Sequence, residues 1–335
     1  MKMPRIIGLF LFLSLFLFAP FFVANAQAAT VTWDGGGDGS TWSDAANWDT
    51  NSVPGADDDV VISTATTVNI TGTTTINSLA IGSPGGGVAS VLNFGYDAIT
   101  GGALVIDDGN ATVYVGASVT HTAGTTSVIG TVFFDVQTGN LNVFGDIHAN
   151  ERGYAKGQGP GEGEDYSAGA GGGAHGGDGG YGQGGIVIST GGSAYGNYKQ
   201  PTSLGSGGGD YAGQSGAGGG AIKLTVAGTT TVNGTVSANG QNGWHNSGRV
   251  SGGGAGGSVW IDTGTLAGSG HVRANGGSTV NSTYDGGGGG GGRVAIYYTT
   301  DNSDFSTLGE EHLEESQEHI TVEQLPNMAE QELYI

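Results

Sequence analysis

The sequence predicts an all-β fold: a parallel β-helix (β-solenoid) with glycine-rich insertions, a tryptophan-rich N-terminal cap and an acidic C-terminal tail. The first observation behind this class is a pair of glycines that runs into an alternating strand four times, beginning at Gly101, Gly219, Gly256 and Gly291. The last three copies are 37 and 35 residues apart. A nearly fixed step of this size with strand-like alternation is typical of stacked β architectures.

The second observation is the motif Gly-x-(Ile/Val)-x-Ala-Asn at residues 145–150, 234–239 and 270–275, of which the last two copies are 36 residues apart. Because inward positions repeat at every coil, we expect equivalent apolar residues to stack in buried rows. One row contains Ile222, Val259 and Val294, and a second contains Val236 and Val272.

The third observation is the composition. Glycine accounts for 71 of 335 residues and charged residues for only 12%, which is far from an ordinary globular domain. Collagen is excluded because the glycines have no strict third-residue period and the chain has only 7 prolines. Valine, isoleucine, leucine and threonine are still common enough to build a core of strands.

The N-terminus predicts a secretory signal peptide over residues 1–26. Lys2 and Arg5 precede an apolar run over 6–23, and Ala24-Asn25-Ala26 has the small-x-small form of a cleavage site. An uncleaved anchor is the alternative, because the run is nearly long enough to span a membrane. No later segment is apolar enough to span one. Cysteine is absent, which favours a bacterial protein over a secreted eukaryotic one. We therefore expect a secreted or cell-surface location.

Residues 27–57 predict a cap. Trp33, Trp42 and Trp48 lie in a turn-rich segment, and a stack of coils needs something to cover its exposed apolar end. We expect Trp42 and Trp48 to be largely buried. Roughly over residues 31–62, the pattern Trp-x-Gly, Trp-Ser-Asp-x-x-Asn-Trp and Pro-Gly-x-x-Asp-x-Val resembles the N-terminal segment of bacterial secreted β-helical proteins, including autotransporter-type passenger domains. The resemblance implies a secreted repeat-β protein and no particular activity.

Residues 58–150 predict β-solenoid coils, because short β-branched segments alternate with turn residues at regular spacing. The expected strands are 60–62, 67–70, 74–81, 90–94, 103–106, 112–115, 126–134 and 141–147.

Residues 151–298 predict a glycine-rich repeat β region. A plain coil needs about twenty residues, so a step near 36 leaves an excess, which is the glycine tract. Glycine segments in extended three-per-turn helices would pack backbone to backbone. Disorder is the alternative for 153–185. Residues 215–298 resemble glycine-rich repeats of bacterial surface proteins, for which no catalytic role is implied. Residues 299–335 predict an acidic tail with a short helix over 308–320.

The net charge of the chain limits the classes of partner that it can bind. The chain has a formal net charge of −21, and removal of the signal peptide takes it to about −23. Nucleic acid is therefore excluded as a partner, because phosphate binding needs basic patches. Lyases need a basic residue beside calcium-bound acids, and hydrolases need converging carboxylates. Neither the lyase set nor the hydrolase set of residues is evident in the sequence, so we assign no catalytic residues.

Lys223 and Arg293 occupy alternating strand positions that we expect to face solvent.

Aspartates in turn-rich segments raise the possibility of calcium. Oxygen-rich flexible loops suit this ion, although Asp and Gly also start turns without any metal, and both interpretations are open. The candidate ligands are Asp34, Asp38, Asp44, Asp57, Asp58 and Asp59.

Tyrosines provide the candidate ligand-binding residues. A planar aromatic ring on a glycine backbone can stack on a sugar or a protein surface, or it can pack on the tract's own backbone. The candidates are Tyr181, Tyr195, Tyr198 and Tyr211. The sequence thus favours a secreted non-catalytic surface or extracellular-matrix protein, engaged in adhesion or glycan binding to cell-surface or matrix components. The alternative is a carbohydrate-active β-helix enzyme, either a polysaccharide lyase or a glycoside hydrolase.

Overall fold

The computed structural model describes residues 28–95, 102–124, 130–210, 214–246, 248–279 and 284–304, and the backbone of 331–334. The predicted signal peptide, Tyr211 and the predicted helix over 308–320 lie outside the described residues. Within these ranges no helix is long and apolar enough to cross a membrane.

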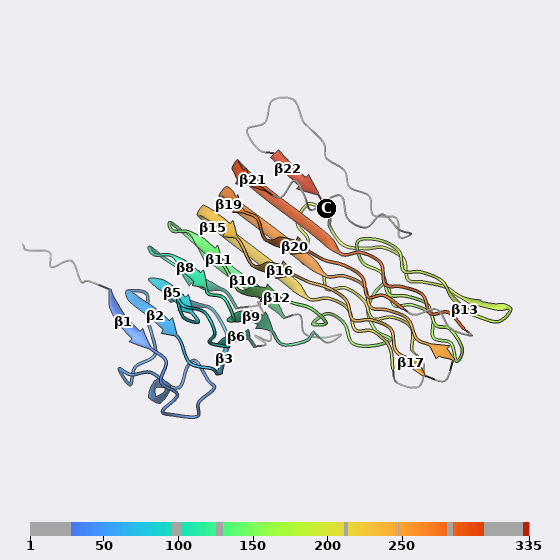
Figure 1. Ribbon diagram of the computed structural model, residues 1–335, viewed down its shortest axis with the longest axis horizontal. Coiled ribbons are helices and arrows are strands. Elements are labelled where there is room, and N and C mark those ends of the chain that lie inside the picture. Colours follow the sequence, from blue (N-terminus) through green and yellow to red (C-terminus); the bar gives the residue numbers. More distant parts are fainter. Residues whose placement is uncertain are drawn as a thin grey trace, which may run out of the picture.

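The fold is all-β, as predicted, and its two large sheets are built mostly from parallel strands (Figure 1). The larger sheet has 12 strands. These are β1 (Ala29–Thr32), β2 (Asp58–Ile62), β4 (Thr74–Ile76), β5 (Ser78–Ile81), β7 (Leu104–Ile106), β8 (Ala111–Val113), β10 (Thr131–Val136), β11 (Leu141–Val143), β15 (Ala221–Val232), β19 (Ser258–Gly268), β21 (Arg293–Ser303) and β22 (Gln331–Tyr334).

The second sheet has 6 strands, and two small hairpins and one 3-10 turn complete the described elements. The six strands are β3 (Thr67–Ile70), β6 (Val91–Phe94), β9 (Ser118–His121), β12 (Asp146–His148), β16 (Thr235–Ser237) and β20 (His271–Arg273). The hairpins are β13 (Gly182–Gly184) with β14 (Val187–Ser189), and β17 (His245–Asn246) with β18 (Arg249–Val250). The turn η1 spans Ala45–Asn47.

The chain visits the sheets in a repeating order. In the first half, each turn of the chain contributes three strands, β2–β3–β4, then β5–β6–β7, then β8–β9–β10, and each strand pairs in parallel with its equivalent in the next turn. In the second half, β15 replaces two of these strands, because its first part pairs with β10 and its second part with β11. The 12-stranded sheet is therefore curled, with two arms that meet at β15.

Two predicted strands are wrong in their extent. The run 74–81 forms two strands, β4 and β5, separated at Asn77, and the run 141–147 forms β11 and β12, separated at Phe144 and Gly145. The chain turns a corner at both places. At the second corner a Cβ on Gly145 would collide with the carbonyl oxygens of Tyr114 and Ala117 in the preceding turn, so only glycine fits. Alternation of apolar residues continues through such corners and does not reveal them.

The predicted buried rows are confirmed. Ile222 is in register with Val259, and Val259 with Val294. Val236 is in register with Val272. All five side chains are at most 4% exposed and belong to one continuous hydrophobic core. This core between the two sheets fixes which side of each strand faces solvent.

The tryptophan block is buried at one end of both sheets. Trp48 is fully buried and Trp42 is 3% exposed. The ring of Trp48 packs edge-on against the rings of Trp42 and Trp33, with ring centroids 4.9 Å apart in both pairs. The indole N–H of Trp48 donates to the carbonyl of Trp42 at 2.8 Å. β1 extends the larger sheet, and Thr41 forms a parallel bridge with Asn69 at the end of the smaller one. The predicted burial of Trp42 and Trp48 is confirmed.

The described glycine tracts pack backbone to backbone. This packing is one expectation from the sequence, and disorder of residues 153–185 is the alternative to it. In residues 252–257, backbone N–H groups three positions apart donate to the same neighbouring segment, so one straight segment binds three others. This period matches an extended helix with three residues per turn. The pairs are Gly252 to Gly209 and Ala255 to Ser206, Gly253 to Gly287 and Gly256 to Gly290, and Gly254 to Gln241 and Gly257 to Ala238.

Side chains are excluded from this glycine bundle by distance. A Cβ on Gly252, Gly253 or Gly254 would lie less than 3.0 Å from a carbonyl oxygen of a neighbouring segment. Real Cβ atoms essentially never approach other atoms that closely. The high glycine content therefore has a packing cause, and the bundle extends the stack beyond the two sheets (Figure 1).

Candidate functional site

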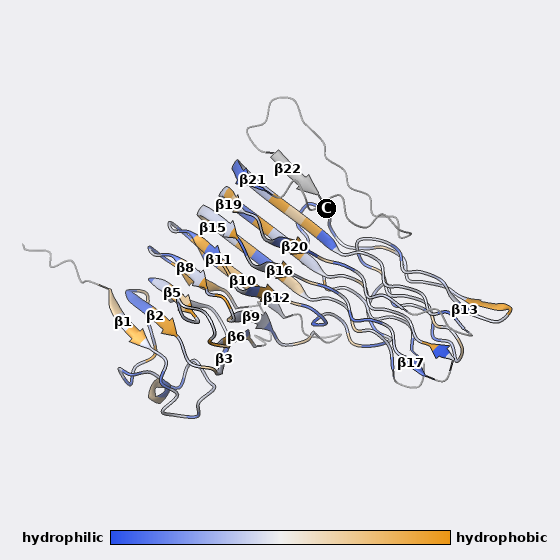
Figure 2. Cartoon of the chain, in the orientation of Figure 1, coloured by the Kyte–Doolittle hydropathy of each residue, from blue (hydrophilic) through white to orange (hydrophobic). Residues whose placement is uncertain are grey.

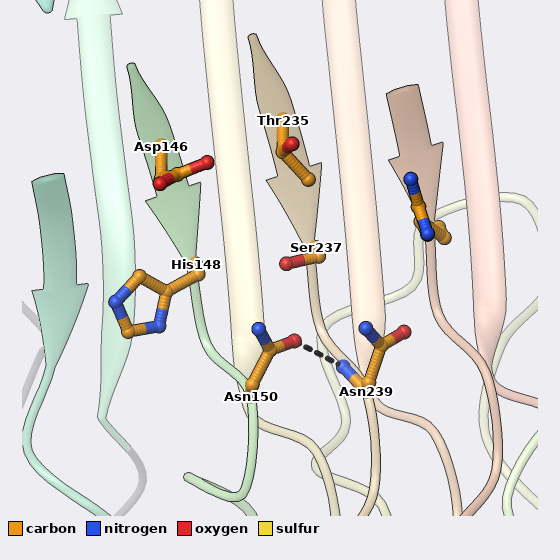
Figure 3. Close-up of a pocket in the computed structure, with 7 residues that line it drawn as sticks. Asp146, His148, Asn150, Thr235, Ser237 and Asn239 are labelled. Atoms are coloured by element: carbon orange, nitrogen blue, oxygen red, sulfur yellow. Dashed lines mark hydrogen bonds between the residues drawn. The ribbon is translucent and has the colours of Figure 1, made fainter. Parts of the chain in front are cut away.

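A polar groove of about 350 Å³ runs across the outer side of the smaller sheet (Figure 3). It crosses three neighbouring strands, β12, β16 and β20, and the side chains in Figure 3 project from these strands and the residues that follow them. The groove is lined by Asp146, His148, Asn150, Thr235, Ser237, Asn239 and Arg273.

The groove is made by the repeated Gly-x-(Ile/Val)-x-Ala-Asn motif. In each copy the aliphatic residue and the alanine point into the core, as Ile147 and Ala149 do with no exposed surface. The two variable positions therefore point outward, because side chains alternate along a strand. Strand register then aligns the copies, and His148, Ser237 and Arg273 form one outward row, in which Ser237 is only 3% exposed.

An asparagine ladder holds the copies together at the lower edge of the groove. The backbone N–H of Asn239 donates to Oδ1 of Asn150 at 2.7 Å (Figure 3). In the same way, the N–H of Asn275 donates to Oδ1 of Asn239 at 2.8 Å. Each bond uses the carbonyl side of an amide. The ladder bonds do not use the Nδ2 donors of these amides.

The charged groups of the groove are few. Asp146 and Arg273 are both exposed. Burial lowers the pKa of His148 below its ordinary value, and the nearby positive charge of Arg152 lowers it further, whereas Asp146 acts in the opposite direction. His148 is therefore mainly neutral near pH 7. Its Nδ1 atom is buried without a hydrogen-bond partner among the described residues.

An aromatic pair includes Phe144, at the corner between β11 and β12. The rings of Tyr114 and Phe144 stack with centroids 6.5 Å apart and an angle of 13° between their planes. Phe144 is 38% exposed and precedes Asp146 by two residues. Aromatic surface beside a carboxylate, amides, hydroxyls and a guanidinium is a combination that can bind sugars, because rings pack on C–H faces while the polar groups bind hydroxyls.

The groove lining provides one carboxylate. Hydrolysis of a glycosidic bond needs two carboxyl groups that flank the bond, and Asp146 is the only acidic residue among the lining residues. The chemistry available is hydrogen bonding to hydroxyls, pairing of Arg273 with an anionic group, and proton uptake by His148.

The described members of the predicted ligand-binding tyrosines lie in different environments. Tyr195 packs against His175, with ring centroids 5.1 Å apart, and its hydroxyl donates to the carbonyl of Leu204 while lying 2.8 Å from Oγ of Ser206. Burial raises the pKa of Tyr195 above its ordinary value. These contacts fit the packing alternative that the sequence left open, and a ligand-binding role for Tyr195 stays a prediction.

The other candidate tyrosines differ in position. Tyr181 is 72% exposed at the base of the β13–β14 hairpin, and Tyr198 is 55% exposed on the segment that follows Tyr195. These two keep an accessible ring. Tyr211 lies outside the described residues, so its predicted role stays a prediction.

The two basic residues expected to face solvent contact other groups. The Lys223 ammonium lies between the rings of Phe133 and Trp260, 4.4 and 4.6 Å from their centroids. The Arg293 guanidinium donates twice to the carbonyl of Tyr195, at 3.1 and 2.9 Å. Both side chains are half-buried, so the strand positions expected to face solvent do so only in part.

The aspartates of the tryptophan block serve as turn acceptors. Oδ1 of Asp38 accepts the N–H groups of Ser40 and Thr41, both at 2.8 Å, and hydrogen bonds hold the pKa of Asp38 well below its usual range, those of the Thr41 and Asn47 side chains foremost. Asp44 accepts from the N–H groups of Asp38 and Ala46. Asp34 accepts from the N–H of Gly36 at 2.9 Å. This is the turn chemistry that the sequence offered as the alternative to calcium.

The three consecutive aspartates, residues 57–59, differ in their contacts. Asp58 accepts from the N–H of Gly55 at 2.8 Å, Asp59 accepts from the Asn77 amide at 2.7 Å, and Asp57 is exposed. Within the described ranges, no three His, Cys, Asp or Glu side chains are grouped so that they could hold a metal ion. Calcium binding stays a prediction from the sequence.

Sequence reasoning missed the groove although its signal was present. The constant positions of the motif indicate the repeats, whereas the signal for the groove lies in its variable positions. Written in register, those positions give Asp146, Thr235 and His271 in one row and His148, Ser237 and Arg273 in the next. The polar character of both rows is the signal that could have found the site.

No known family model matches the chain, and no curated protein or solved structure shows significant similarity to it. The resemblance to bacterial secreted β-helical surface proteins therefore stays a prediction based on sequence patterns.

Proposed function

We propose that this protein is a secreted, non-catalytic surface or extracellular-matrix protein that attaches to glycans through the groove of the smaller sheet. The observation that carries the proposal is the in-register outward row of polar groups on β12, β16 and β20, which ends at the exposed Arg273. A ligand with hydroxyls at regular intervals along its length would find donors and acceptors at the strand spacing of about 4.8 Å. The finer description of the fold in this proposal is a β-solenoid, which the three-strand turns of the first half support.

The rigidity of the site supports binding by a preformed surface. The groove residues stand on strands whose inward side chains are buried, and the asparagine ladder fixes the ends of those strands. A preformed site loses little side-chain freedom when a ligand binds, so shallow contacts still yield useful affinity. Many such sites on a cell surface would add through avidity.

One observation favours the enzyme as the second candidate. The groove brings His148, which is mainly neutral near pH 7, to the same outward row as Arg273. A neutral imidazole can take a proton next to a sugar carboxylate while a guanidinium neutralises that carboxylate, which is the chemistry of a polysaccharide lyase. Against this candidate, the strongly negative chain repels acidic polysaccharides.

A glycan array with the mature protein tests the proposal. We expect binding to a defined set of glycans that weakens about tenfold or more in Arg273→Ala and in Asp146→Asn, because each loses hydrogen bonds to a charged group. Arg249→Ala, which removes an exposed arginine on the β17–β18 hairpin, is the matched control. The proposal is refuted if the unmodified protein binds no glycan. It is also refuted if both groove variants bind as tightly as the unmodified protein.

Incubation with pectin and alginate separates the two candidates. The adhesion proposal predicts that no unsaturated sugars are released. Release of unsaturated sugars by the unmodified protein, lost in His148→Ala, would replace adhesion by lyase activity as the function of the groove.

A further inference from the structure

The β13–β14 hairpin exposes an apolar tip at the end of the molecule farthest from β1 (Figure 2). Ile186 is fully exposed, Ile188 is 63% exposed and Val187 40% exposed. Tyr181, 72% exposed, stands at the base of the same hairpin. Four apolar side chains grouped in this way are costly in water, since a soluble protein gains from covering such surface.

The tip is presented by a firmly held hairpin. The two strands pair in antiparallel register around a turn at Gly185 and Ile186, and Gly185 adopts a φ of 69°, which suits a tight two-residue turn. At the base, the N–H of Gln183 donates to the carbonyl of Asp285 at 2.7 Å, and the Ser189 hydroxyl donates to the carbonyl of Gly169 at 2.6 Å. The apolar side chains therefore project outward from the glycine bundle and do not fold back on it.

The charge distribution indicates what covers the tip. Residues 181–189 contain no charged side chain, whereas the neighbouring segments contribute Glu162, Glu164, Asp178 and Asp285. An anionic surface would repel these acidic neighbours, while a surface without net charge would not. The tip thus fits an uncharged apolar phase bordered by a zwitterionic layer.

The size of the tip argues against a protein partner. Four side chains present a few hundred Å² of apolar surface, which is less than the roughly 800 Å² per partner that a stable protein interface buries. Insertion into lipid has no such minimum, because each apolar side chain gains by leaving water. An aromatic ring with a hydroxyl at the base suits the headgroup region, as tyrosines at membrane interfaces do.

We propose that the β13–β14 hairpin inserts its tip into the outer layer of a zwitterionic lipid bilayer, with Ile186 and Ile188 in the acyl region and Tyr181 among the headgroups. This membrane contact is separate from the groove on β12, β16 and β20 and does not depend on glycan binding. A rigid hairpin of this length reaches a depth of about 5–10 Å, which matches interfacial insertion.

Flotation with phosphatidylcholine vesicles tests the proposal. We expect the mature protein to float with these vesicles and to float less with vesicles that contain phosphatidylglycerol, because the chain is strongly negative. The double substitution Ile186→Ser with Ile188→Ser should reduce the partition coefficient at least about tenfold. Val115→Ser is the matched control, because Val115 is 60% exposed at a corner between β8 and β9.

Insertion is measured independently with Ile186→Trp, whose fluorescence should be quenched by brominated phosphatidylcholine. The proposal is overturned if the unmodified protein stays unbound, if the double variant floats equally well, or if brominated lipid leaves the fluorescence of Ile186→Trp unchanged. Self-association of the unmodified protein that the double variant lacks, without vesicle binding, would show instead that the tip contacts a second copy. Loss of glycan binding in groove variants has no bearing on these outcomes.

Discussion

The backbone N–H of Ala221 donates to Nε2 of His121 at 3.2 Å, although the two residues are 100 positions apart. His121 ends β9, and Ala221 begins β15, so this bond ties the first half of the stack to the strand that follows the longest glycine-rich insertion. On the other side of the ring, Nδ1 lies 2.7 Å from the carbonyl of Thr122 and donates to it. His121 is fully buried, and this pattern requires the neutral ring, because a protonated Nε2 would face the N–H of Ala221.

Two buried histidines predict loss of stability on mild acidification. Burial lowers the pKa of both His121 and His175 from 6.5 to about 4. Between pH 6.5 and 4 these histidines bind protons in the unfolded chain but stay neutral in the native protein. The free energy of unfolding therefore falls as pH falls through this window. The expected loss is about 3 kcal/mol for each histidine. Urea unfolding at a series of pH values measures it.

A substitution shows which histidine causes this pH dependence of stability. His121→Gln should reduce the slope of unfolding free energy against pH between 6.5 and 4, and the remaining slope belongs to His175 and His148, whose pKa values burial also lowers. His271→Gln, at an exposed position on β20, is the matched control. The interpretation fails if the His121 variant keeps the full slope. Asp38 contributes in a separate window: because its pKa is depressed in the folded protein, its contribution is lost only as pH falls below the ordinary aspartate range.

The glycine bundle predicts intolerance to a single methyl group. Gly254→Ala would place a Cβ against the carbonyl oxygen of Ala217, and neither backbone can move without breaking hydrogen bonds. We expect the free energy of unfolding to fall by at least about 2 kcal/mol. Gly85→Ala is the control, since no atom lies within 4 Å of a Cβ at that position. Equal stability of the two variants in urea would contradict the packing described.

The tryptophan block predicts a second stability effect. Trp48 is fully buried and contacts both other indoles, so Trp48→Ala should lower the free energy of unfolding by about 3–5 kcal/mol. Trp244→Ala, at a position 37% exposed, should change it little. Deletion of residues 31–56 should give insoluble protein, because the uncovered sheet ends would pair with other chains. A soluble deletion variant that melts cooperatively would show that the block is no cap.

Tyr195 predicts a structural effect without a binding effect. Tyr195→Phe removes the hydroxyl that binds the Leu204 carbonyl and Ser206, and should cost about 1–3 kcal/mol of stability. Glycan binding by the folded variant should be unchanged. Tyr198→Phe, at an exposed ring, is the control for stability. If Tyr195→Phe weakened glycan binding without changing the melting temperature, the tyrosine would belong to a ligand site.

The repeated parts of the fold could be predicted from the sequence because their signal is local. Ile222, Val259 and Val294 stand at fixed steps after paired glycines, so their alignment follows from the period alone. The corner at Gly145 could not be placed, because its cause is the approach of carbonyl oxygens from the preceding turn. A clash between turns leaves no trace in the alternation of one segment.

The candidate site was less predictable, because burial in this protein depends on which segments cross. Tyr195 and Tyr198 are three positions apart and look alike in the sequence, yet only Tyr195 packs its ring against His175. The partners of the glycine segments were equally hidden: Gly253 binds Gly287, and a run of glycines carries no pattern that identifies its neighbour. Tertiary contact decides such cases.

Amide hydrogen exchange in residues 252–257 tests the central claim most directly, namely that the glycine tracts form one hydrogen-bonded body with the sheets. Every N–H in this stretch donates to a neighbouring segment. We predict that these amides exchange only through global unfolding, slowed about a thousandfold or more relative to an unstructured peptide. Exchange of these amides at the rate of an unstructured peptide, with the β15 and β19 amides still protected, would contradict the account.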